Sequence, residues 1–113
     1  MSPERAQELL AAERQRIERA LADLREPVGA DELSTLDNPA DQGTVLYERE
    51  LEEGLLERLR RDLEALERAE GRLADGTYGL SVESGEPIPD ERLEAYPLAE
   101  RTVDEERRRQ RGL

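Results

Sequence analysis

Residues 56–73 read LERLRRDLEALERAEGRL, and this stretch decides the fold. Its leucines follow the alternating three- and four-residue spacing of a heptad, with charged residues at most positions between them: Leu56, Leu59, Leu63, Leu66 and Leu73. Such spacing places apolar side chains along one stripe of an α-helix. The stretch therefore predicts a long helix that packs against one neighbouring helix.

The same helix extends in both directions from this stretch. Asn38-Pro39-Ala40-Asp41 is a typical helix start, with Asn as the N-cap and Pro at the first helical position. Asp75-Gly76 is a typical helix end. We therefore predict a helix over about 39–75, with a length of about 50 Å.

The N-terminal half of this predicted helix departs from the heptad. Leu46, Leu51 and Leu55 fit it only after a shift of register, which predicts irregular packing near Gly54. Gly54 and Gly71 are also candidate points of close approach by the partner helix, because glycine has no side chain to keep a neighbour away.

A partner helix is predicted over about 3–26, with Ser2 as its N-cap and Pro27 after its end. Leu10, Ile17 and Leu24 recur every seven residues, and Ala6, Leu21 and Val28 widen the stripe. The stretch from Pro27 to Pro39 contains two prolines and a glycine, so we expect residues 27–38 to form the connecting tip. Residues 1–75 thus form an antiparallel helical hairpin, or coiled coil.

Residues 76–113 predict a small globule. Turn residues separate two short apolar stretches within 78–89, which indicates a short β-hairpin, and a short helix follows at about 90–96. Thr102-Val103-Asp104-Glu105 has the spacing of a capping box that opens a terminal helix reaching Arg111. We expect its apolar residues to form the globule's core: Leu80, Val82, Ile88, Leu93, Tyr96, Leu98 and Val103.

Composition excludes several classes of function. The chain has 17 basic and 29 acidic residues and a net charge of −12, a balance that repels nucleic acid phosphates and anionic lipid. It has neither Cys nor His, and so lacks thiolate nucleophiles and the commonest metal ligand and general base. No stretch has the apolar character of a signal peptide or membrane span. We therefore expect a cytoplasmic protein that is not an enzyme and binds no cofactor.

Two groups of residues have a recognisable pattern. In the predicted globule these are Gly76-Thr77-Tyr78-Gly79-Leu80, Gly85-Glu86-Pro87-Ile88-Pro89 and Glu91-Arg92-Leu93-Glu94-Ala95. In the predicted hairpin they are the run from Leu36 to Thr44 and then Tyr47-Glu48-Arg49-Glu50. The first group resembles the C-terminal zinc-finger region of the DksA/TraR family of transcription factors, and the second resembles the tip of the family's hairpin, particularly in its Gram-positive stress-protein branch.

The resemblance implies a coiled-coil hairpin on a small zinc-binding globule, with RNA polymerase as the partner. It implies that the hairpin enters the secondary channel of the polymerase and that acidic tip residues approach the active centre and alter initiation. The family tip reads Asp-x-x-Asp-x-Ala, and here the matching residues are Asn38, Asp41 and Gly43. Asp37 stands beside Asn38, and we take Asp37, Asn38, Asp41, Gly43 and Thr44 as the candidate partner-binding tip.

The zinc ligands of the family have no counterpart in this chain. Four cysteines bind zinc in the family, and the matching positions here are Ser81, Ser84, Thr102 and Glu105. Structural zinc needs thiolate or imidazole ligands, so we predict a zinc-finger-like globule without zinc. Serine hydroxyls that bond the turn backbone, the capping box and apolar packing are the expected replacements.

Three functions remain open at the level of the sequence. The first is a transcription regulator that binds RNA polymerase through Asp41 and its neighbours, although an acid three residues after an N-cap can also serve as a helix cap alone. The second is a helical adaptor or stress protein that kept the shape without polymerase activity. The third, a carboxylate-based metal enzyme, has little support without His or Cys. The sequence does not indicate whether a guanosine alarmone cooperates.

Overall fold

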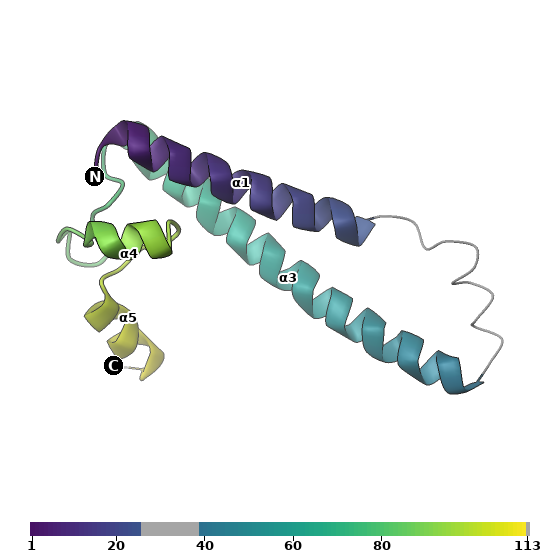
Figure 1. Ribbon diagram of the computed structural model, residues 1–113. Coiled ribbons are helices and arrows are strands. Elements are labelled where there is room, and N and C mark those ends of the chain that lie inside the picture. The colour runs from purple at the N-terminus through teal and green to yellow at the C-terminus, as the bar shows by residue number, and fades with distance from the viewer. Residues whose placement is uncertain (26–38, 113) are drawn as a thin grey trace.

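The computed structural model describes residues 1–25 and 39–112, in which a two-helix arm is joined to a small globule. Helix α1 spans Pro3–Arg25, α3 spans Pro39–Asp75, α4 spans Asp90–Ala95 and α5 spans Val103–Gln110. The two long helices run antiparallel (Figure 1). They lie together near the N-terminus and diverge toward the opposite end. The expected helical hairpin is confirmed, and the predicted tip over 27–38 lies outside the described residues.

The ends of the long helices follow local signals. The Ser2 hydroxyl accepts a hydrogen bond from the Arg5 N–H at 3.1 Å, which caps α1 as expected. Gly76 adopts φ +80° after α3, and the Thr77 N–H donates to the Arg72 carbonyl at 2.8 Å. This left-handed residue ends the helix because glycine reaches positive φ without steric cost.

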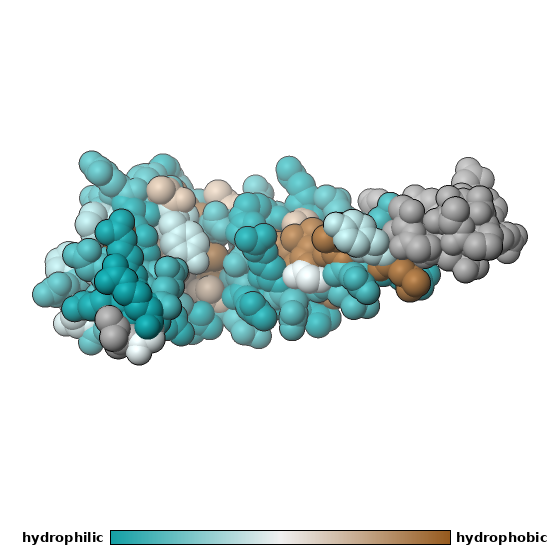
Figure 2. Space-filling view, turned by 90° about the horizontal axis from the view of Figure 1, so that it is seen from below, coloured by the Kyte–Doolittle hydropathy of each residue, from teal (hydrophilic) through white to brown (hydrophobic). Residues whose placement is uncertain are grey.

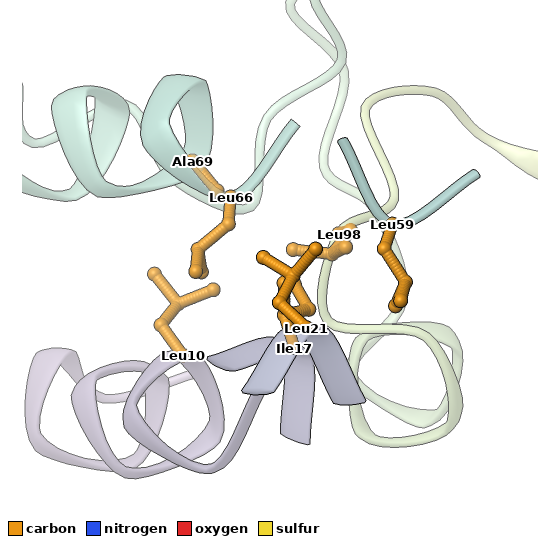
Figure 3. Close-up of a cluster of buried hydrophobic side chains, with 7 residues drawn as sticks. All are labelled: Leu10, Ile17, Leu21, Leu59, Leu66, Ala69 and Leu98. Atoms are coloured by element: carbon orange, nitrogen blue, oxygen red, sulfur yellow. The ribbon is translucent and has the colours of Figure 1, made fainter. Parts of the chain in front are cut away.

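The seam between α1 and α3 contains the expected heptad residues. Leu10, Ile17 and Leu21 of α1 face Leu59, Leu66 and Ala69 of α3 (Figure 3), and Ile17 and Leu66 are fully buried. Other apolar side chains pack around them while partly exposed: Ala20, Leu24, Leu56, Leu63, Ala65, Leu73 and Tyr78. The apolar stripe read from the sequence is therefore the core of the arm.

The prediction that the glycines of α3 mark close approach of the partner helix was wrong. A Cβ atom added at Gly54 or at Gly71 would meet no heavy atom within 4 Å. Neither glycine marks a close approach of the partner helix. Leu46, Leu51 and Leu55 are 58%, 56% and 44% exposed, so they do not rejoin the seam after a register shift. The described seam ends at Leu56.

The globule has less regular structure than expected. In place of a β-hairpin, the described residues contain an isolated antiparallel bridge between Leu80 and Pro87. Ile88, Leu93 and Leu98 are buried as predicted, but four other expected core residues are exposed: Leu80, Val82, Tyr96 and Val103. The described residues provide no second layer that covers these four side chains. Ala99 is buried in their place.

The globule shares a core with the arm. Leu98 belongs to the same buried cluster as Leu10, Ile17 and Leu66 (Figure 3), whereas Ile88, Leu93 and Ala99 form a smaller cluster of their own. Tyr78 packs against both clusters and donates its hydroxyl to the Pro97 carbonyl at 2.8 Å. None of the described helices is both long and apolar enough to span a bilayer.

We expect Leu66→Ala to lower the free energy of unfolding by about 3 kcal/mol, because it leaves a cavity in the fully buried seam. The matched change Leu51→Ala, at an exposed position of the same helix, should alter it by less than about 0.5 kcal/mol. Urea unfolding followed by circular dichroism measures both. Equal losses in the two variants would contradict the assignment of the seam.

Candidate functional site

Ion pairs join the globule to the end of the arm near the N-terminus, where α1 and α3 lie together (Figure 1); we call this the closed end of the arm. The Arg5 guanidinium binds the Glu94 carboxylate of α4 with two hydrogen bonds of 2.8 and 2.6 Å. Arg68 of α3 binds Glu100 in the same two-bond manner, and Arg72 adds a bond of 3.3 Å to Glu100. These contacts lower the pKa of Glu94 through Arg5 and the pKa of Glu100 mainly through Arg68. The Arg5–Glu94 pair is exposed and therefore contributes little to stability. The Glu100 side chain is only 20% exposed, so its pairs with Arg68 and Arg72 lie partly out of water.

The four positions that match the family's zinc ligands lie together in the globule as a polar cluster, defined here as Ser81, Ser84, Thr102 and Glu105. A backbone hydrogen bond of 2.9 Å from the Val82 N–H to the Glu100 carbonyl joins the turn at 81–85 to the segment before α5. The turn itself is closed by the Gly85 N–H, which donates to the Ser81 carbonyl at 2.9 Å. Backbone pairing thus brings residues some twenty positions apart into one site.

The expected capping box is present at the start of α5. The Thr102 hydroxyl accepts from the Glu105 N–H at 3.3 Å, and the Glu105 carboxylate accepts from the Thr102 N–H at 2.8 Å. This arrangement satisfies two backbone donors that a helix N-terminus leaves free. Glu105 is one of the two buried polar residues among those the structure describes, and Ser81 is the other.

The serines extend this box across the globule. The Ser81 hydroxyl oxygen accepts from the backbone N–H groups of Glu83 and Ser84, at 3.1 and 3.3 Å, and Ser84 accepts from the Glu86 N–H at 3.2 Å. The hydrogen bond from the Thr102 N–H is the main cause that lowers the pKa of Glu105 to about 2, and the hydroxyls of Ser81 and Ser84 lower it further. The sequence had predicted the cap and the turn bonds but not that one carboxylate links them.

The chemistry of the polar cluster does not suit zinc. Two serines and a threonine supply neutral hydroxyls, and the single carboxylate is already bonded to backbone and hydroxyl donors. Within residues 1–25 and 39–112, no group of three or more His, Cys, Asp or Glu side chains is placed to hold a metal ion. Zinc prefers thiolate and imidazole ligands, so the donor set does not fit this metal.

The predicted partner-binding tip lies at the opposite end of the molecule. Asp41, Gly43 and Thr44 belong to the first two turns of α3. Asp37 and Asn38 lie outside the described residues, and so does the predicted role of Asn38 as an N-cap. Toward the globule, the described surface of α3 is acidic and exposed at Glu48, Glu50, Glu52 and Glu53.

We expect the contribution of Glu105 to stability to depend on pH. Because folding lowers its pKa from 4.5 to about 2, this contribution is complete above about pH 4.5 and is lost as the pH falls through 2. Glu105→Gln, which can still form the box but carries no charge, should be less stable than the wild type at pH 7 and equally stable near pH 2. Thermal unfolding of both proteins at stepwise lower pH measures the gap. A gap that stays constant down to pH 2 would show that the charge is not involved.

We also expect purified wild-type protein to contain no stoichiometric zinc, and a chelator to leave its unfolding temperature unchanged, because hydroxyls do not replace thiolates. A variant with cysteine at positions 81, 84, 102 and 105 provides the positive control. It should bind one zinc ion and unfold at a lower temperature with chelator. Metal analysis by mass spectrometry measures the content, and one zinc per wild-type chain would contradict the assignment.

Comparison with known proteins relates the globule to a described family and the fold to solved structures. Residues 76–111, which contain the whole polar cluster, match the family described as prokaryotic dksA/traR C4-type zinc finger. The chain is 48% identical over 69 residues to the uncharacterized protein YteA of Bacillus subtilis, and 43% identical over 65 residues to general stress protein 16O of the same organism. It is 38% identical over 72 residues to the RNA polymerase-binding transcription factor DksA of Caulobacter vibrioides.

These matches cover 60%, 58% and 64% of this chain. They span only 29%, 40% and 51% of the respective relatives, so the chain matches at most about half the length of these curated proteins. The comparison of structures covers a larger share of this chain. Transcription factor DksA2 from Pseudomonas aeruginosa superimposes with a TM-score of 0.63 at 26% identity, over 96% of this chain and 80% of that one. Residues 76–111 thus match the zinc-finger model of the DksA/TraR family, and the chain shares the fold of DksA2, but it has none of the four cysteines of the zinc finger.

Proposed function

We propose that this protein regulates transcription by binding RNA polymerase and inserting the far end of its arm into the secondary channel, where Asp41 acts near the active centre and modulates initiation. The proposal is carried by the superposition of 96% of the chain on the DksA2 structure. The relative from Caulobacter vibrioides, a protein described as RNA polymerase-binding, adds the partner. In this proposal the protein is not an enzyme, and it acts in the cytoplasm together with the polymerase.

The length of the arm suits insertion into a narrow channel. Helix α3 has 37 residues and is therefore about 55 Å long. The globule contacts the arm through Glu94 and Glu100 at the closed end, so the other end of α3 projects away from it. A site that must act inside a larger protein needs such a separation between its tip and its base.

Charge supports a protein partner and opposes direct binding of nucleic acid or membrane. The chain carries a net charge of −12. An acidic surface is repelled by phosphate backbones and anionic lipid, and it is attracted to a channel that is lined by basic groups. Asp41 contributes to this mechanism through its charge, by acting on a metal ion or cationic group that the polymerase holds.

One observation favours a second function. The chain is 43% identical over 65 residues to a protein described as a general stress protein, and it lacks the zinc ligands of its family. A helical adaptor that kept the arm but acts on another partner is therefore the alternative. Whether a guanosine alarmone cooperates in either function is a separate question that polymerase assays with and without the nucleotide answer.

We expect Asp41→Asn to reduce the effect of the protein on open-complex formation about tenfold, which corresponds to the loss of about 1.4 kcal/mol of charge interaction. Binding to the polymerase should remain within about twofold, because a single substitution at the tip leaves the rest of the arm surface intact. A promoter-open-complex assay measures the first quantity and fluorescence anisotropy with purified polymerase measures the second.

Asp75→Asn is the matched control, because it removes the same charge from the opposite, exposed end of the same helix. It should leave both measurements unchanged. If Asp41→Asn behaves like this control, Asp41 has no role beyond the helix start. If the wild-type protein does not bind polymerase at all, the proposed function is wrong and the adaptor function remains.

A further inference from the structure

Helix α3 presents an apolar stripe that the fold does not use. We define the α3 stripe as Tyr47, Leu51 and Leu55, which are 63%, 56% and 44% exposed. The three residues are spaced by four, so they lie along one side of the helix over about 12 Å. Figure 2 shows apolar side chains gathered on the surface of the arm between the globule and its grey end.

The stripe is not an extension of the core. The seam with α1 ends at Leu56, and α1 itself ends at Arg25. The two helices diverge from there (Figure 1). A continuous row of large apolar side chains on a surface helix is typical of a docking face for another polypeptide, which binds such rows at positions spaced by three and four.

The charges around the stripe define what can bind there. Glu48 and Glu52 border it on one side and Glu50 on the other, and all three are exposed. Residues 46–57 contain five Glu and one Arg, which gives a local net charge of 1 − 5 = −4. A second copy of this chain would bring the same acidic border with it. Like charges that face each other across an interface oppose association, so the charges disfavour a dimer through the stripe.

The same reasoning applies to the chain's own segment 26–38. It contains four acidic residues and no basic ones, so its charge does not complement the border of the stripe either. Nucleic acid is excluded in the same way, because its phosphates are repelled by the glutamates. A surface with the opposite charge remains.

We propose that the α3 stripe docks on a basic polypeptide surface of the partner protein, one that places apolar side chains on Tyr47, Leu51 and Leu55 and Arg or Lys beside Glu48, Glu50 and Glu52. The inference rests on the proposed function in one respect, namely that this partner is RNA polymerase. It adds a second contact region on the arm, about two to four helical turns nearer the globule than Asp41. The stripe provides affinity, whereas the tip acts on the reaction centre.

Photocrosslinking to purified RNA polymerase tests the proposal. A photoreactive residue is placed at position 51 in the stripe, at position 41 in the tip, and at position 53, which is exposed on the opposite side of the same turn. We expect position 51 to crosslink to a polymerase peptide that contains Arg or Lys and apolar residues, and to do so more strongly than position 53. Crosslinks from 41 without crosslinks from 51 overturn the stripe but leave the proposed function in place.

Other results identify other occupants. A crosslink from position 51 to a second copy of the chain, or to its own residues 26–38, overturns the proposal. The absence of crosslinks from all three positions overturns the proposed function and this inference with it. Mass spectrometry of the crosslinked peptides distinguishes these cases.

Substitutions provide a second test with an independent measurement. Leu51→Ala should weaken binding to polymerase about tenfold, while the exposed control Glu53→Ala leaves binding unchanged. The double change Glu48→Arg and Glu52→Arg should also weaken binding, because it brings positive charge against a basic surface. Stronger binding after this reversal overturns the proposed charge of the partner. Unfolding midpoints of all variants, which change exposed positions only, verify that the arm is intact.

Discussion

The packing of α1 on α3 is the interaction on which the rest of the molecule depends. Ile17 and Leu66 are fully buried at its centre, and Leu10, Leu21, Leu59 and Ala69 surround them. A pair of helices has only one contact face, so each helix buries a single stripe and exposes the rest. This explains how a chain with 41% charged residues still folds into long helices. It also explains the shape: α3 is longer than α1 and projects where the seam ends.

The globule needs stabilisation from outside its own core, because a unit of under forty residues rarely forms an adequate core by itself. Zinc supplies the missing stability in the C4-type zinc fingers that residues 76–111 match. Here Leu98 joins the core of the arm, Tyr78 bridges the two clusters, and Glu105 links Ser81, Ser84 and Thr102. Hydrogen bonds of this kind are individually weak compared with a structural metal. The globule therefore depends on the arm, and the ion pairs of Arg5 and Arg68 keep the two in register.

Charge and exposure divide the arm into regions with different roles. The seam near the globule is apolar and shared between α1 and α3, whereas beyond Leu56 the helix carries exposed glutamates around Tyr47, Leu51 and Leu55. A helix that keeps large apolar side chains in water gains nothing for its own stability from them. In the binding mode proposed above, the surface of the partner supplies both the missing apolar contacts and the opposite charge, and the acidic end and the stripe act together on one protein.

The sequence by itself determined the helix bounds, because caps and breakers act over a few residues: Ser2, Gly76 and the Thr102–Glu105 box each end or begin a helix where expected. It also identified the seam, since the heptad is a property of the stripe alone. Only the tertiary structure decided which other apolar residues are buried. Leu51 and Leu66 were both predicted to pack in the seam, Leu51 after a shift of register, yet Leu51 is 56% exposed and Leu66 is fully buried, because burial requires a facing helix. For the same reason the influence of the two serines on the pKa of Glu105 was not predictable: it arises only after Val82 pairs with Glu100 and brings the turn to the start of α5.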